Sequence, residues 1–163
     1  MADLIYLMGF LNHTPPLGEH ETNLSDEHIT LLSEVSVPDK NLNTWVANLS
    51  SIMFWHPKFT VKQEHELWLG SMLDIPAVSV TTNPVNAMQA LHKDLLASLN
   101  HVSGKVAKPE YAGINFLPHI SHAKYTGTLY EFTTLSLIHH QDGFGENVVN
   151  LANFNLAPLQ QIF

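Results

Sequence analysis

Cysteine, arginine and long apolar runs are all missing from this chain of 163 residues. Without Cys the chain can form neither disulfides nor thiolate metal sites, which fits a protein of the reducing cytoplasm. No stretch reaches 18 apolar residues, so we expect no membrane span. Residues 1–11 are apolar but have neither a basic start nor a small-residue cleavage site, and they predict a strand rather than a signal peptide.

The absence of arginine limits the partners that the chain can bind. Seven lysines stand against 15 acidic residues, for a formal net charge of −8. Tight binding of long nucleic acid depends on many Lys and Arg contacts with phosphates, so we expect no binding of tRNA or duplex DNA. A small nucleotide held by a few donors remains compatible. The composition, 45% hydrophobic and 13% charged, is that of a globular chain with a real core. It leaves the oligomeric state open.

Two of the 11 histidines stand in the same short pattern. Residues 28–31 read His-Ile-Thr-Leu, and residues 118–121 read Pro-His-Ile-Ser. Both stretches are apolar enough to predict strands, on which side chains two apart share a face at about 6.6 Å. His28 and Thr30 therefore point the same way, as do His119 and Ser121. Two such motifs about 90 residues apart suggest a site with two imidazoles and two hydroxyls.

The order of the predicted elements suggests a weak internal duplication. Helical spacing of apolar residues predicts helices at 41–54 and from Pro84 to about residue 100. Strands are predicted at 2–11, 27–35, 59–63, 66–70, 77–81, 117–125, 130–139 and 147–156, with a loop at 12–23 and a turn at 143–145. Each half then carries one motif strand and one helix. We expect two similar lobes within one domain over residues 1–163.

With these motifs and this order of elements, the whole chain resembles the 2H phosphoesterase superfamily, which includes the LigT-type RNA ligases and phosphodiesterases. The resemblance implies a bilobal, pseudo-symmetric α+β fold, with two antiparallel sheets around a central cleft and helices packed outside. It implies chemistry without metal or cofactor on 2′,3′-cyclic phosphates, or on 2′-5′ and related phosphodiesters of small nucleotides. Some viral and phage-encoded members destroy oligonucleotide immune signals, which would place the chain in the host cytoplasm.

Two positions near the second motif differ from that family. LigT-type members often carry a cationic residue three positions after the second hydroxyl residue, and here this position is Lys124 instead of Arg. A lysine supplies charge to a phosphate but not a bidentate fork. His122 stands where the family pattern usually has an apolar residue. It suggests a polar patch on the far side of the sheet.

The chemistry of phosphodiester cleavage suits these residue types. One imidazole can take a proton from the nucleophile while the other, protonated, gives one to the leaving oxygen. The hydroxyls of Thr30 and Ser121 can bind the non-bridging oxygens as charge builds up on them. The sequence does not decide whether His28 or His119 is the base.

Aromatic side chains near such a site could stack on a nucleobase. The candidates are Tyr6, Phe10, Trp68, Tyr125 and Phe144. Burial statistics favour core positions for Tyr6, Phe10 and Trp68. We retain Tyr6, Phe10, Tyr125 and Lys124 as predicted substrate-binding residues.

Several alternatives compete with this interpretation. A single His on a strand is more often structural than catalytic, and only the matched pair favours catalysis. A metal site on His119 and His122, or on His139 and His140, is disfavoured because residues three apart or adjacent on a strand point to opposite faces. Two other functions remain open. One is RNA end-processing or 2′-5′ ligation, and the other is a non-catalytic nucleotide-binding module on the same scaffold.

Overall fold

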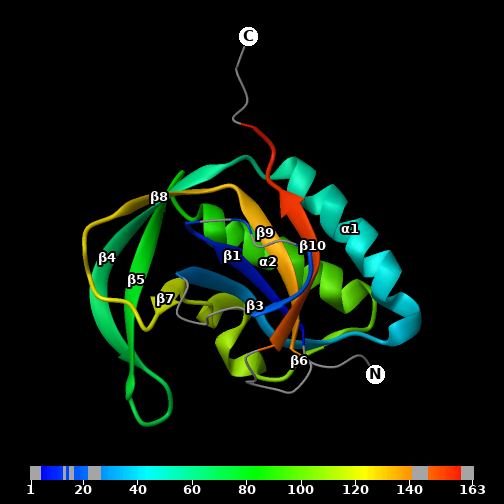
Figure 1. Cartoon of the computed structure of the whole chain (residues 1–163), viewed down its shortest axis with the longest axis horizontal. Coiled ribbons are helices and arrows are strands. Elements are labelled where there is room, and N and C mark those ends of the chain that lie inside the picture. Colours follow the sequence, from blue (N-terminus) through cyan, green and yellow to red (C-terminus); the bar gives the residue numbers. More distant parts are fainter. Residues whose placement is uncertain (1–4, 13, 15–16, 22–26, 141–146, 159–163) are drawn as a thin grey trace.

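The computed structural model describes residues 5–12, 14, 17–21, 27–140 and 147–158 (Figure 1). Two helices are described, α1 (Leu42–Trp55) and α2 (Ala87–His101). The described strands are β1 (Ile5–Phe10), β2 (Gly18–Glu21), β3 (His28–Ser36), β4 (Phe59–Leu69), β5 (Ile75–Asn83), β6 (Lys105–Val106), β7 (His119–Ser121), β8 (Leu129–Phe132), β9 (Thr134–His140) and β10 (Asn147–Asn155). Short 3₁₀ turns lie at η1 (Asp39–Asn41), η2 (Pro109–Tyr111) and η3 (Gly113–Asn115). No described helix is long and apolar enough to cross a membrane.

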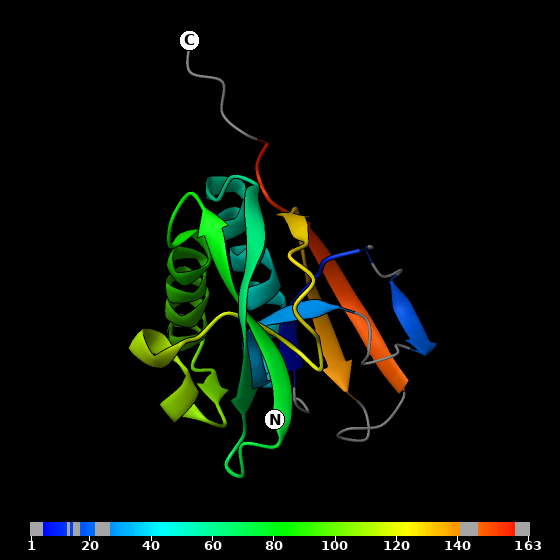
Figure 2. The same cartoon turned by 90° about the vertical axis from the view of Figure 1, so that its left-hand side faces the viewer.

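The strands form one curled sheet in the order β2-β10-β9-β1-β3-β7-β5-β4-β8, with β6 paired to β3. Every pair of named strands is antiparallel. The expected α+β class is therefore confirmed. The two groups of strands, one per half of the sheet, join through β3 and β7 into a continuous sheet. Both helices lie on the same side of it (Figure 2), where α1 contacts β10 and α2 contacts β3.

The main core lies between the helices and the sheet. Residues four apart on α1, Trp45, Leu49 and Met53, are buried, as the amphipathic pattern predicts. The buried stripe of α2 consists of Met88, Leu91, His92, Leu95, Ser98 and Leu99. These helices share a core with Ile29 of β3 and Ile120 of β7. Each fully buried aliphatic side chain contributes about 1.5–3 kcal/mol relative to an exposed one. The core thereby fixes the two motif strands.

Three predicted strand boundaries were wrong. The predicted loop at 12–23 contains β2, which pairs with β10. The predicted strands 59–63 and 66–70 are a single β4, because its register with β5 shifts between Gln63 and Glu66 without ending. The predicted strand 130–139 is divided at Thr133 into β8 and β9, which pair with different neighbours.

The start of α2, near Pro84, and the end of β7, near His122, also differ from the prediction. Pro84 precedes α2 rather than occupying its first turn, and Asn86, with a left-handed φ of 61°, separates the two. The hydroxyl of Thr82 accepts a hydrogen bond from the backbone N–H of Ala87 at 3.1 Å, which satisfies one free donor of the first turn. The strand predicted at 117–125 is shorter, because His122 turns the chain with a φ of 57°. The predicted turn at 143–145, with Phe144, lies outside the described residues.

Candidate active site

The two motif strands are hydrogen-bonded neighbours. β3 and β7 pair antiparallel with Ile29 opposite Ile120. Both isoleucines are 0% exposed and belong to the main core. Residues on either side of them must therefore point to the other face of these two strands.

The same register brings the two motifs together in a crossed arrangement. Because Ile29 pairs with Ile120 in antiparallel register, His28 lies opposite Ser121 and Thr30 lies opposite His119. All four side chains share one face and are half-buried. The two imidazoles are diagonal neighbours, for which side chains are typically about 7–8 Å apart. Each imidazole thus has a hydroxyl of the other motif beside it.

His119 is held in one tautomer by its own strand. Its Nδ1 atom donates to the backbone oxygen of Leu117 at 2.7 Å. The Nε2 atom is then the acceptor in the neutral ring. Burial lowers the pKa of His119, and the hydrogen bond to Leu117 opposes this shift only partly. Near neutral pH the ring is therefore neutral and can take up a proton at Nε2.

His28 is flanked by β1. Phe10 is its partner across the β1–β3 pair, and the two ring centroids lie 5.6 Å apart at 44°. Phe10 is only partly buried. Phe10 thus lies next to a motif histidine and on the same face. Its contact with a substrate stays a prediction.

The neighbour on the other side of His119 is Ser79 of β5. It is 2% exposed, and its hydroxyl contacts the bulged part of β4, with Glu64 Oε2 at 3.3 Å and His65 Nδ1 at 3.2 Å. The sequence did not single out Ser79. Only the register of β5 against β7 identifies it, and no local pattern encodes that register.

Comparison with solved structures shows the same architecture. TT0787 of Thermus thermophilus matches at 13% identity and a TM-score of 0.68, over 96% of this chain and 100% of that one. A protein described as a phosphoesterase matches at 17% identity and a TM-score of 0.63, over 96% and 99% of the two chains. LigT of E. coli, complexed with NADP+, matches at 17% identity and a TM-score of 0.61, over 96% and 98%.

The chain has the LigT fold. The fold expected from the resemblance to the 2H phosphoesterases is thereby confirmed. No family model and no curated protein matches the sequence.

Within this LigT fold, Lys124 and Tyr125 lie on a segment that β4 holds. The backbone N–H of Tyr125 donates to Glu66 Oε1 at 3.0 Å, and Gln63 Oε1 accepts from the N–H groups of Thr126 and Gly127 at 2.7 and 3.1 Å. Lys124 and Tyr125 are both exposed. These contacts tie their segment to a strand that β5 separates from β7. Their contact with a substrate stays a prediction.

Gln63 is also part of a buried chain of hydrogen bonds that leads to the first motif. Its Nε2 donates to the Tyr130 hydroxyl at 3.2 Å, and that hydroxyl donates to the carboxylate of Glu27, the residue before His28. Burial and the Glu27 carboxylate raise the pKa of Tyr130. The start of β3 and the segment after β7 are thus linked through polar groups.

The remaining aromatic candidates differ in position. Tyr6 is 7% exposed and belongs to a second buried cluster with Met8 and Ile138. Burial, followed by the nearby charge of Glu34, raises the pKa of Tyr6. The prediction that Trp68 is a core residue was wrong: it is 60% exposed, because it lies near the tip of the β4–β5 hairpin, where no other layer covers it. Stacking by Tyr6 stays a prediction.

The sequence did not single out His92, which lies on the buried stripe of α2. It is 3% exposed, and its ring stacks on Phe116 at 4.0 Å between centroids. Its Nδ1 donates to the backbone oxygen of Leu31 at 2.7 Å, and its Nε2 accepts from the N–H of Gly113 at 2.9 Å. Burial lowers its pKa, so the neutral ring persists. His92 therefore joins β3 to the segment that leads into β7.

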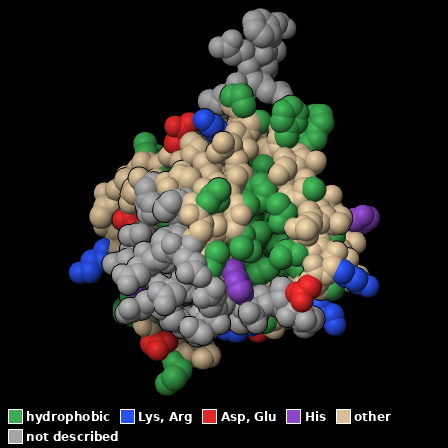
Figure 3. All heavy atoms as spheres, turned by 45° about the vertical axis from the view of Figure 1, so that its right-hand side comes forward, with side chains coloured by type: hydrophobic (Ala, Val, Ile, Leu, Met, Phe, Trp, Pro, Cys, Tyr) green, Lys and Arg blue, Asp and Glu red, His purple; other side chains and the backbone are tan. Residues whose placement is uncertain are grey.

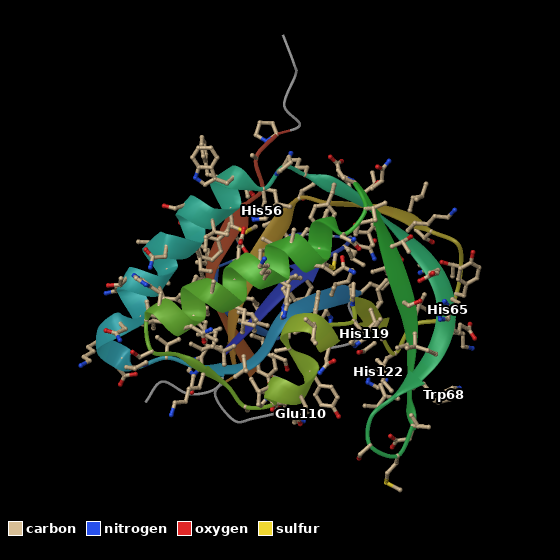
Figure 4. The ribbon with its side chains drawn as sticks, turned by 180° about the vertical axis from the view of Figure 1, so that it is seen from behind. His56, His65, Trp68, Glu110, His119 and His122 are labelled. Carbon is tan, nitrogen blue, oxygen red and sulfur yellow. The ribbon has the colours of Figure 1, made fainter. Side chains whose placement is uncertain are left out.

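His122 directly follows the second motif, but it lies beyond the end of β7. Its backbone N–H donates to Pro76 at 2.7 Å, and its exposed side chain follows the left-handed turn that ends β7. Figure 4 shows it near His119 and the hairpin of His65 and Trp68, whereas His56 lies beside α1. Among the described residues, no group of three or more His, Asp or Glu side chains could hold a metal ion.

Proposed function

We propose that this chain is a 2H-type phosphodiesterase that hydrolyses small nucleotide substrates by two-histidine acid–base catalysis, without a metal ion. The supporting observation is the register of β3 and β7, which sets His28 beside Ser121 and His119 beside Thr30 on one face. Fold alone supports many activities, so the proposal depends on these four side chains. Solved structures of the fold include E. coli LigT complexed with 3′-AMP and with phosphate, ligands of the proposed kind.

His119 is the proposed base. Its Nδ1–H is occupied by Leu117, and burial favours the neutral ring, so Nε2 has a free electron pair near pH 7. It takes the proton of the attacking hydroxyl, from water or from a 2′-OH beside the scissile bond. The attacking oxygen forms a bond to phosphorus, and the bond to the leaving oxygen breaks. Each such acid or base role typically contributes about 10²–10⁴ in rate.

His28 is the proposed acid. As an imidazolium it gives its proton to the leaving oxygen, so that no strongly basic alkoxide is expelled. The hydroxyls of Thr30 and Ser121 donate to the non-bridging oxygens, where negative charge grows in the transition state. After turnover His119 carries a proton and His28 lacks one, and exchange with water restores both. A water nucleophile gives hydrolysis, and a 2′-OH nucleophile gives a cyclic phosphate.

Cyclic or 2′-5′-linked oligonucleotides and 2′,3′-cyclic phosphates are the proposed substrates, and an oligonucleotide immune signal would fit this class. RNA end-processing or ligation on long RNA is less compatible with a net charge of −8. Among the coloured side chains of Figure 3, hydrophobic ones gather beside the grey region, and lysines stand singly towards the edges rather than in a basic patch.

A substrate panel read by mass spectrometry tests the proposal. The protein is incubated in chelator with cyclic dinucleotides, 2′-5′-linked oligoadenylates and 2′,3′-cyclic nucleotides. We expect cleavage of at least one class, and loss of at least about 10² in rate in His28→Ala and in His119→Ala. His101→Ala, at the exposed end of α2, is the matched control and should retain full activity. Tight binding without product, unchanged in both motif variants, would instead identify a binding module.

A further inference from the structure

A buried serine lies between His119 and the rest of the β5–β4–β8 surface, and its hydroxyl is hydrogen-bonded to a carboxylate. Ser79 lies directly opposite His119 across the β5–β7 pair. Its hydroxyl contacts Glu64 Oε2 at 3.3 Å and the backbone oxygen of His65 at 3.3 Å. The register shift in β4 between Gln63 and Glu66 turns this short stretch towards Ser79. The Glu64 carboxylate therefore contacts Ser79, the residue next to the proposed base His119.

The charges beyond Ser79 on the same face are mostly negative. Lys62 lies opposite Thr81, two residues along β5 from Ser79, and so shares its face. On β8, Glu131 lies opposite Thr60 and therefore points the same way as Lys62. All three charged side chains, Lys62, Glu64 and Glu131, belong to exposed residues. Their sum is one negative charge.

Such a surface is poorly suited to a second phosphate. Binding a polyphosphate requires a surplus of cationic or N–H donors, and arginine, which serves this purpose best, does not occur in the chain. Lys62 is the one cation among these three side chains and shares its face with the two carboxylates. The segment of Lys124 is itself held by a carboxylate, because the backbone N–H of Tyr125 donates to Glu66 Oε1. A phosphate placed on the β5–β4–β8 surface would therefore meet more repulsion than attraction.

We infer that the β5–β4–β8 side of the site accepts an uncharged nucleoside and disfavours a second phosphate group, so that the substrates carry internal phosphodiesters and no terminal polyphosphate. Cyclic oligonucleotides and linear ones with a 5′-hydroxyl have this chemistry, and 5′-triphosphorylated oligonucleotides do not. This inference rests on the proposed phosphodiesterase function and narrows its substrate class. Glu64 and Glu131 are then residues that determine specificity through charge.

Matched substrates provide the test. A 2′-5′-linked diadenylate with a 5′-hydroxyl is compared with the same compound carrying a 5′-triphosphate, at low and at high salt. We expect kcat/KM for the 5′-hydroxyl compound to be at least about tenfold higher at low salt, with the ratio falling as salt screens the carboxylates. A cyclic diadenylate is included as a third substrate without any terminal phosphate. Equal or faster cleavage of the triphosphate would overturn the inference.

Charge-neutral variants test the residues. In the double variant Glu64→Gln/Glu131→Gln, the ratio of kcat/KM between the 5′-hydroxyl and 5′-triphosphate compounds should drop to about threefold or less. The variant removes two negative charges at constant side-chain size. Asp39→Asn/Glu110→Gln changes the net charge equally, at exposed positions in η1 and η2, and should leave the ratio unchanged. A ratio that stays tenfold in the first variant would also overturn the inference. If none of the three compounds is cleaved or bound by the unaltered protein, the proposed function itself fails.

Discussion

Leu31, the residue after Thr30, accepts a hydrogen bond from Nδ1 of the buried His92 at 2.7 Å. The other ring nitrogen accepts from Gly113, which lies six residues before His119. One imidazole on α2 therefore bonds to the chain next to both motifs. Its two bonds require the neutral ring, since a protonated Nε2 could not accept from a backbone N–H.

Replacing His92 should weaken the fold measurably. His92→Leu keeps an apolar side chain in the core but leaves the oxygen of Leu31 and the N–H of Gly113 without their partner. We expect a loss of about 2–4 kcal/mol in the free energy of unfolding, measured by urea titration. The control, His101→Ala, alters an exposed residue and should stay within about 0.5 kcal/mol. An unchanged midpoint in His92→Leu would show that water replaces both bonds.

Stability should fall in mild acid. Burial lowers the pKa of both His92 and His119 below the ordinary value of 6.5. The unfolded chain then binds more protons than the native one between those lowered values and 6.5, so the free energy of unfolding rises with pH in that window. The contribution is fully present above pH 6.5 and is lost progressively below it. Urea titrations across mild acid to neutral pH measure the slope. His92→Leu should reduce it, and an unchanged slope would contradict this assignment.

The sequence predicted those parts of the fold that local patterns encode. Both helices were predicted to within a few residues because their apolar stripes have a clear period, and the motif strand at β3 because His28 and Thr30 alternate with buried Ile29 and Leu31. The single β4 was missed because the polar pair Glu64 and His65 looked like a break. In the structure it is a bulge whose side chains contact Ser79.

The sequence predicted those features of the candidate site that depend on a single strand, and not those that depend on which strands pair with each other. Alternation within a strand gave the shared face of His119 and Ser121. The sequence contained no signal for the crossed arrangement, or for Ser79 and Gln63, because these depend on which strands become neighbours. The sequence also gave no sign of the tautomer of His119, because this depends on the hydrogen bond from Nδ1 to the backbone oxygen of Leu117.

The two motif hydroxyls should be needed for rate more than for binding. Thr30→Val and Ser121→Ala each remove a donor to the non-bridging oxygens with little change in shape. Because that interaction strengthens in the transition state, we expect kcat to fall by about 10²–10³ with KM changed little. Steady-state kinetics on a substrate from the panel measure both constants. A large rise in KM at constant kcat would show that the hydroxyls bind the substrate and the transition state equally.

The pH–rate profile should show the lowered pKa of His119. If this ring is the base, kcat/KM of the free enzyme rises with pH through an acid limb that lies below 6.5, because the neutral form must be present. His119→Ala should lose this limb together with most of the rate, while His28→Ala should keep the acid limb in its residual activity. An acid limb that disappears in His28→Ala and persists in His119→Ala would exchange the two roles.

Gln63 should matter for the segment that carries Lys124. Its Oε1 accepts two part-buried backbone N–H groups and its Nε2 donates to the Tyr130 hydroxyl. Gln63→Leu therefore removes the partner of both N–H groups and leaves Tyr130 with Glu27 alone. We expect a loss of about 2–3 kcal/mol in stability and, if Lys124 contacts the substrate, a rise in KM that exceeds the fall in kcat. Lys124→Gln should then reproduce the KM effect without the loss of stability. A normal KM in both variants would remove Lys124 from the binding site and leave Gln63 as a purely structural residue.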